Sequence, residues 1–253
     1  MTDAPTGLPQ RARVALAVQR VVCFALSPLT TLAALVILRF RLRLRFAGTR
    51  ELRRAYRSFR RTSKAPLLVC GNHLTMIDSA LIAYALGSPL WYMLNFASLP
   101  WNVPDRNVFA AKPWQQALTY VYKCLPIERG GSRMEVADTI ARFTHLLSRG
   151  EVGLIFPEGG RSRTGRVEVE NAAYGVGRIV KSVPGCRVLC VYLRGDAQRE
   201  YSGLPQRGDT LRARIAWLEP KSDLRGLRAS RDISRQILTR LAELEREHFD
   251  AVA

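Results

Sequence analysis

The sequence predicts one α/β domain, a mixed sheet flanked by helices, preceded by an N-terminal membrane element. Apolar runs of strand length alternate with helical stretches from residue 41 to residue 253, which is typical of α/β proteins. A chain of 253 residues is long enough to bury a full core. The most apolar stretch lies by itself at residues 21–38. We therefore expect an anchoring segment at 1–40 and an α/β domain at 41–253.

The apolar stretch at residues 21–38 reads VVCFALSPLTTLAALVIL and has arginines on both sides. A cleaved signal peptide is disfavoured, because arginines rather than a small-residue cleavage site follow it. One helix of this length reaches about 27 Å against a bilayer core of about 30 Å, and Pro28 interrupts it. We expect a helix–bend–helix hinged near Ser27 and Pro28 that enters one leaflet and returns. A single spanning helix and a buried core helix are the alternatives.

The chain is strongly basic, with 39 Lys and Arg against 21 Asp and Glu and a net charge of +18. This balance indicates an anionic partner, such as nucleic acid, an anionic membrane or a phosphorylated substrate. Residues 39–64 contain Glu51 as their single acid and directly follow the apolar stretch. Anionic headgroups attract such segments by about 1 kcal/mol per basic side chain. We expect membrane contact rather than a merely solvated charge run. Because no nucleic-acid-binding motif is present, we expect no nucleic acid partner.

The predicted elements follow each other without a long linker. Strands are expected at residues 41–46, 67–70, 152–156, 187–193 and 211–218, and helices at 50–61, 79–86, 114–122, 132–150 and 171–183. Ser132 and Glu135 form a capping box, and Ser230 is expected to cap a final helix. The aromatic-rich residues 89–104 fit protein core, an interfacial patch or the wall of a tunnel for an apolar chain.

The cysteines and histidines do not predict a metal site. The five cysteines form no CxxC pair and most lie in apolar runs, which indicates reduced, buried thiols. None of the three histidines clusters with cysteine or acidic residues at metal-ligand spacing. We expect neither a metal nor a redox cofactor.

A candidate catalytic pair lies where the predicted strand at 67–70 passes into a helix. Asn72 and His73 follow Gly71, and Asp78 comes five residues after the histidine. On one helix, residues five apart point about 140° apart, so the two can meet only if His73 precedes the helix. Asp78 would then hold one imidazole nitrogen and leave the other as a base. A plain turn with a helix-capping aspartate is equally supported by these residues alone.

A candidate anion-binding loop follows the predicted strand at 152–156. It reads PEGGRSRTG, and its glycines let backbone N–H groups approach an anion, while Arg161 and Arg163 offer bidentate phosphate contacts. A structural ion-pair knot around Glu158 is the alternative. Arg129 lies at another strand end, beside the paired Gly130 and Gly131.

Four blocks in this order resemble the 1-acylglycerol-3-phosphate O-acyltransferases and related glycerolipid acyltransferases. The blocks are NHLTMID at 72–78, CLPIER at 124–129, FPEGGRSR at 156–163 and the apolar residues 188–193. The resemblance covers residues 41 to 220, and the FPEG block is its most specific part. It implies a membrane-bound enzyme of phospholipid biosynthesis on the cytoplasmic face of the inner or cytoplasmic membrane. The implied reaction moves a fatty acyl group from acyl-CoA or acyl carrier protein to lysophosphatidic acid and yields phosphatidic acid.

The resemblance also implies roles for individual residues. His73 would be the general base and Asp78 its orienting partner, in a direct attack without an acyl-enzyme. The acceptor phosphate would lie near Arg129, Glu158, Gly159 and Arg161, and Lys112 would be a further phosphate contact. Because Glu158 cannot itself bind phosphate, we expect it to position Arg129 or Arg161.

Three positions depart from the family pattern. Gly160 stands where the family usually has threonine, Glu128 stands where it usually has aspartate, and the fourth block lacks its proline. The first two lie in the acceptor-binding blocks. They favour, as an alternative, another acceptor such as a lyso-aminolipid, for example lyso-ornithine lipid, or a different lysophospholipid. A non-catalytic basic protein that binds membranes or nucleic acid is an alternative of another class, and it leaves the four blocks unexplained.

Overall fold

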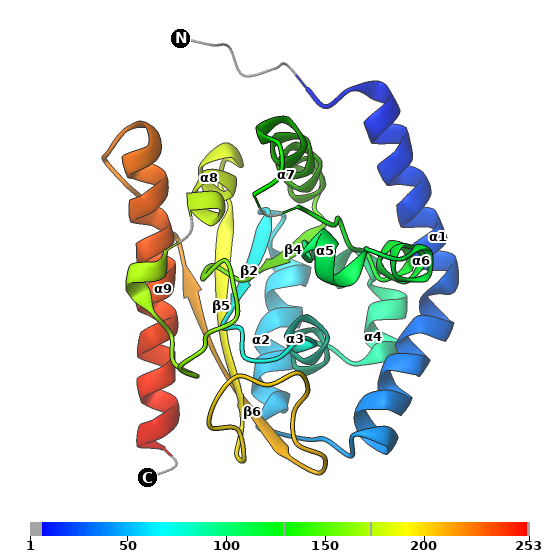
Figure 1. Ribbon diagram of the computed structural model, residues 1–253, viewed down its shortest axis with the longest axis vertical. Helices are drawn as coiled ribbons and strands as arrows, with labels where there is room; N and C mark the ends of the chain where they lie inside the picture. The colour runs from blue at the N-terminus through cyan, green and yellow to red at the C-terminus, as the bar shows by residue number, and fades with distance from the viewer. Residues whose placement is uncertain (1–6, 129, 173, 252–253) are drawn as a thin grey trace.

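The computed structural model describes residues 7–128, 130–172 and 174–251, and it confirms the expected α/β class (Figure 1). A six-stranded mixed sheet has the strand order β1-β6-β5-β2-β4-β3. The strands are β1 (Arg45–Ala47), β2 (Leu67–Gly71), β3 (Trp101–Asn102), β4 (Val152–Ile155), β5 (Arg187–Gly195) and β6 (Thr210–Leu218). β5 and β6 are antiparallel, and the other neighbouring strands are parallel.

The central strand β2 determines where the site lies. It is buried along its whole length and runs parallel to both β4 and β5, with Cys70 opposite Ile155 and Cys190. Parallel strands end at the same edge of a sheet. The segments that follow β2, β4 and β5 therefore meet at one edge, although these strands end at Gly71, Ile155 and Gly195, far apart in sequence.

Helices cover both faces of the sheet. They are α2 (Thr49–Thr62), α3 (Asp78–Leu86), α4 (Pro89–Leu94), α5 (Arg106–Phe109), α6 (Pro113–Val121), α7 (Arg133–Ser148), α8 (Tyr174–Ser182) and α9 (Gly226–Asp250). Alternate residues of β2 point to opposite faces. Leu68 and Cys70 pack in a core with α7, α8 and α9. Leu67 and Val69 pack in a second core with α2, α3 and α4.

The expected N-terminal helical element is present as α1 (Gln10–Val36), which continues as a π-helical segment at Ile37–Arg41. Figure 1 shows it on the opposite side of the molecule from α9, with a change of direction along its length. Pro28 lies inside the helix, so its two arms are continuous rather than separated by a turn. The hydroxyls of Thr30 and Thr31 donate to the carbonyls of Leu26 and Ser27, a pattern that often bends helices.

In helix α1 the large apolar residues face outward, which is the reverse of an amphipathic helix in a soluble protein. The side that packs on the rest of the protein is made mostly of small or polar residues: Ala12, Leu16, Gln19, Cys23 and Ser27. The exposed side carries large apolar residues: Val14, Val18, Val21, Phe24, Leu26, Leu29 and Leu32. By length and composition, the helix from Gln10 to Arg41 could cross a membrane.

Two local predictions are wrong. The strand expected at residues 41–46 is reduced to β1, because the chain first closes a turn in which Leu42 and Leu44 donate to the carbonyls of Ile37 and Leu38. The alternating leucines are buried by this turn rather than by a strand. Ser230 does not cap the last helix, since α9 begins at Gly226. A side chain on Gly177 would clash with the carbonyl of Ser230, so Ser230 lies where α8 and α9 pack closely.

The other predictions agree more closely with the structure. Ser132 caps α7 by accepting from the backbone N–H of Glu135 at 3.2 Å. The described cysteines are free thiols, of which Cys124 is half-buried and the others are buried.

Candidate active site

The candidate catalytic pair lies in the turn between β2 and α3. The strand ends at Gly71 and the helix begins at Asp78, so His73 precedes the first helical turn as pairing requires. The imidazole Nδ1 of His73 lies 2.9 Å from Oδ2 of Asp78. This pairing directs the other ring nitrogen, Nε2, away from the carboxylate and leaves it available as a proton acceptor.

Asp78 is held in place by further hydrogen bonds. Its Oδ2 accepts from the backbone N–H groups of Leu74 and Thr75 at 2.5 and 2.6 Å, and its Oδ1 accepts from the Thr75 hydroxyl at 2.5 Å. The residue is 3% exposed. These short hydrogen bonds to a buried side chain fix its rotamer. The carboxylate can therefore orient the imidazole and stabilise its protonated state.

Two residues that sequence reasoning did not single out also position the histidine. The Phe156 ring stacks on the His73 ring at a centroid distance of 4.1 Å and an interplanar angle of 11°. The buried Asn72 amide donates to the carbonyl of Leu193 at 3.0 Å and accepts from its N–H at 2.8 Å. Asn72 therefore continues the pairing of β2 with β5 for one more residue. Its place between a strand and a histidine was the available signal.

His73 and Arg161 line the same cavity, which has a volume of about 240 Å³. The loop after β4 is joined to the catalytic turn by a hydrogen bond of 2.9 Å from the N–H of Ser162 to the carbonyl of His73. The Arg161 guanidinium lies over the Tyr201 ring, 5.4 Å from its centroid. The structure thus brings a base and an exposed cation together around one space.

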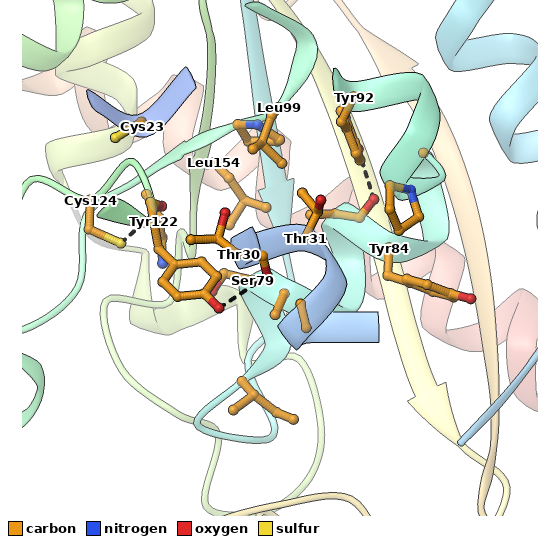
Figure 2. Close-up of a pocket in the computed structure, with 18 of the residues that line it drawn as sticks. Cys23, Thr30, Thr31, Ser79, Tyr84, Tyr92, Leu99, Tyr122, Cys124 and Leu154 are labelled. Atoms are coloured by element: carbon orange, nitrogen blue, oxygen red, sulfur yellow. Dashed lines mark hydrogen bonds between the residues drawn. The ribbon is translucent and has the colours of Figure 1, made fainter. Parts of the chain in front are cut away.

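An apolar cavity of about 230 Å³ adjoins the histidine cavity, and the two share Met76, Ser79 and Tyr122. Figure 2 shows residues of α1, α3 and α4 around it, with the Tyr122 hydroxyl donating to the carbonyl of Thr30. Helix α1 is therefore part of its wall. The aromatic-rich segment contributes Tyr92 and Phe96, which agrees with the tunnel-wall alternative for those two residues.

Gly159 lines a third cavity, of about 350 Å³, together with Glu128 and Gly130. Gly159 has a φ of +69°, a left-handed conformation that favours glycine. Phe156 and Val103 separate this cavity from the histidine cavity, since both residues line the two spaces. The second and third sequence blocks therefore lie beside each other next to the histidine.

Glu158 is half-buried, and burial raises the pKa of its carboxyl to about 8. The backbone of His73 hydrogen-bonds to it and opposes this shift. Within the described part of the chain, Oε1 of Glu158 has no hydrogen-bond partner. Burial therefore favours the protonated form of Glu158, which can donate a hydrogen bond.

Of the remaining predicted site residues, Lys112 is described by the structure and Arg129 is not. Lys112 is exposed at the start of α6 and is not among the described residues that line the histidine cavity. Arg129 lies outside the described residues. The described residues also contain no group of three or more His, Cys, Asp or Glu side chains that could hold a metal ion.

A sequence profile of the acyltransferase family matches residues 43–194, more than half of the chain. The chain belongs to the acyltransferase family. A comparison with individual curated proteins gives no match. The matched region contains β2, β4 and β5 with the segments that follow β2 and β4, whereas α1 and α9 lie outside it.

Helix α1 is joined to this acyltransferase domain by a buried polar network. Glu151 accepts from the Lys123 ammonium at 2.7 Å, from the Trp101 indole at 2.9 Å and from Arg20 of α1 at 2.6 Å. Gln19 of α1 donates to two backbone carbonyls of the α6 region. These hydrogen bonds fix the position of α1 beside the apolar cavity.

Proposed function

We propose that this acyltransferase moves a fatty acyl group from acyl-CoA or acyl carrier protein to the free hydroxyl of lysophosphatidic acid. The observation that carries the proposal is that His73, paired with Asp78, lines the same cavity as Arg161. A base beside a cation fits an acceptor that has a hydroxyl and a phosphate a few bonds apart.

The proposed reaction is a direct transfer. His73 Nε2 removes the proton of the acceptor hydroxyl while the oxygen attacks the thioester carbonyl. The C–S bond then breaks, and the departing thiolate takes the proton back from the imidazolium. Asp78 stabilises the imidazolium between these steps, and positioned base catalysis of this kind contributes about 10²–10⁴-fold. The residues need no metal or redox cofactor for this chemistry.

The acceptor phosphate is proposed to bind at Arg161 and Gly159, with Arg129 and Glu158 beside them. A protonated Glu158 can donate a hydrogen bond to a phosphate oxygen without charge repulsion. Lys112 is proposed as an outer contact, because it begins the helix that leads to Leu118 and Tyr122 in the cavity wall. The apolar cavity beside α1 is proposed to hold the acyl chain of the donor.

The membrane is proposed as the partner of the exposed face of α1. Helices α4 and α6 contact α1 and add exposed Leu90, Leu94 and Trp114 to this apolar surface. Basic residues dominate α2 and can bind anionic headgroups. We propose that segment 1–40 anchors domain 41–253 to the cytoplasmic face of the inner or cytoplasmic membrane.

The deciding experiment measures transfer of a labelled acyl group to lysophosphatidic acid by membranes that carry the protein, with acyl-CoA and acyl carrier protein as donors. Wild-type protein is expected to form phosphatidic acid, and His73→Ala is expected to form none above background. His145→Ala is a matched control, because His145 lies on α7 away from the cavity. Full activity of His73→Ala would overturn the mechanism.

A second acceptor class is supported by Glu128 and Gly160, the two departures from the family pattern that lie in the acceptor-binding blocks. Glu128 lines the cavity next to Gly159 and can pair with a cationic acceptor group. A panel of lysophosphatidic acid, other lysophospholipids and lyso-ornithine lipid, assayed with the same membranes, separates the two proposals. Preference for the amine-containing acceptor, lost in Glu128→Gln, would favour the second.

A further inference from the structure

A buried arginine lies at the end of β5, next to but outside the cavity lined by His73. Arg194 is 5% exposed. Its guanidinium donates to three backbone carbonyls: Gly165 at 2.5 Å, Arg199 at 2.7 Å and Gln198 at 2.9 Å. An Arg194 nitrogen also lies 3.3 Å from the Tyr192 hydroxyl. A buried cation that donates mainly to carbonyls is costly to desolvate, so its position needs an explanation beyond packing.

The three carbonyls belong to two different loops. Gly165 lies in the arginine loop, which we define as residues 157–166, and Gln198 and Arg199 lie in the β5–β6 loop, residues 196–209. Gly165 has a φ of +68°, and a Cβ atom there would lie 2.5 Å from the carbonyl oxygen of Arg199. The loops therefore touch directly, and Arg194 joins them from the rigid end of the sheet.

Both loops contact the catalytic site. The arginine loop carries Arg161 and bonds His73 through Ser162. The β5–β6 loop places the Tyr201 ring against the Arg161 guanidinium. Its next two residues hold the catalytic turn, because Ser202 N–H donates to the Leu74 carbonyl at 2.9 Å and Met76 N–H donates to the Gly203 carbonyl at 3.1 Å.

We propose that Arg194 is a positioning residue that sets the distance between Arg161 and His73. It acts through the two loops and does not touch the substrate. The proposal rests on the proposed function, in which Arg161 binds the acceptor phosphate and His73 the acceptor hydroxyl. Misplacing one of these groups by about 1 Å can cost about a hundredfold in rate.

The first test compares Arg194→Met with Arg194→Lys in the full-length protein. Arg194→Met keeps an unbranched apolar stem but removes every donor. We expect it to raise the KM for lysophosphatidic acid about tenfold or more and to change the donor KM less than about twofold. Arg194→Lys retains one set of donors and is expected to recover part of the acceptor KM. Arg235→Met, which removes an exposed arginine paired with Glu170 outside both loops, is the matched control.

A merely structural role predicts a different result. It would lower kcat through a smaller folded fraction and leave both KM values unchanged, and that outcome overturns the proposal. Tyr201→Leu offers a variant that keeps every Arg194 bond but removes the ring beneath Arg161. We expect it to raise the acceptor KM in the same direction as Arg194→Met.

A double-mutant cycle decides whether Arg194 acts through Arg161. In an Arg161→Met background, adding Arg194→Met is expected to change the acceptor KM by less than about twofold, because the group it positions is already gone. Full additivity of the two changes would overturn the proposal. If Arg161→Met alone leaves the acceptor KM unchanged, the proposed acceptor site is wrong.

Amide hydrogen exchange distinguishes a wrong acceptor site from a wrong positioning role of Arg194. Arg194→Met is expected to increase exchange in residues 157–166 and 196–203 and to leave β2 and β5 as protected as in the wild type. This measurement needs no substrate. Unchanged exchange in the two loops, or a uniform increase through the sheet, would overturn the role of Arg194 whatever the acceptor is.

Discussion

At the scale of single residues, the hydrogen bonds around Asp78 make it an acceptor. His73 Nδ1, two backbone N–H groups and the Thr75 hydroxyl all lie within hydrogen-bond distance of its two oxygens. A carboxylate satisfies these donors together and fixes the Nδ1–H form of the imidazole. The geometry thus explains why position 78 carries an aspartate rather than an asparagine.

Asp78→Asn is expected to lower kcat by about 10²–10⁴-fold, because an NH₂ group then faces other donors and disfavours the reactive tautomer. The acceptor KM should change only a few-fold, since Asp78 does not face the phosphate. Steady-state kinetics with lysophosphatidic acid checks both. A loss of less than tenfold in kcat would contradict the orienting role.

Glu158 gives a prediction of pH dependence. Burial raises its pKa from 4.5 to about 8 in the folded protein, so folding is opposed progressively as pH rises through that range. Glu158→Gln removes the ionisable carboxyl, so the stability of the variant lacks this dependence on pH. We expect the Tm of the wild type to fall relative to that of the variant as the pH rises from 5 to 8. This window lies between the ordinary pKa of the carboxyl, 4.5, and its raised pKa of about 8. Parallel Tm curves would show that the carboxyl ionises normally.

At the scale of elements, α1 docks through a buried polar network and through the burial of a few residues such as Leu16. Lys123 is fully buried, and burial lowers the pKa of its ammonium to about 8, with Glu151 opposing the shift. Glu151 joins this ammonium to Arg20 of α1. A large apolar surface is therefore left on the other side of the helix, where it can meet lipid.

Glu151→Gln is expected to destabilise the protein by about 3–5 kcal/mol, because it leaves the buried Lys123 charge uncompensated. Denaturant unfolding in detergent measures the change. Asp196→Asn is the matched control, since it breaks an exposed pair with Arg212 that is worth at most about 1 kcal/mol. Equal effects of the two substitutions would mean that the buried network does not hold α1.

At the scale of the whole molecule, the apolar surface of α1, α4 and α6 lies on the side opposite α9 (Figure 1). Leu29 on α1 and Leu227 on α9 are 66% and 71% exposed, so they are matched positions on opposite sides. Leu29→Glu is expected to weaken partition into anionic phospholipid vesicles by about tenfold or more, the cost of not burying one leucine. Leu227→Glu should leave partition unchanged. Vesicle sedimentation distinguishes them, and equal effects would contradict the proposed orientation.

Local features of the fold were predictable from the sequence because they depend on neighbouring residues. The apolar run of β2, the cap of α7 and the spacing of His73 and Asp78 are all local patterns. The strand expected at residues 41–46 was wrong because Leu42 and Leu44 first close a turn with the carbonyls of Ile37 and Leu38. The cap expected at Ser230 was wrong because α9 begins earlier, at Gly226, and Ser230 lies where α8 and α9 pack closely.

The sequence alone determined the α/β class and the apolar composition of the N-terminal helix. It also determined that the histidine and the aspartate are spaced so that a turn can bring them together. The tertiary structure decided which side of α1 faces the domain, that Arg161 shares the cavity of His73 while Lys112 does not, and that Arg194 joins two loops beside that cavity. The physical reason is that β2, β4 and β5 are brought together by parallel pairing across the sheet. The contacts at their common edge therefore join residues that no local pattern relates.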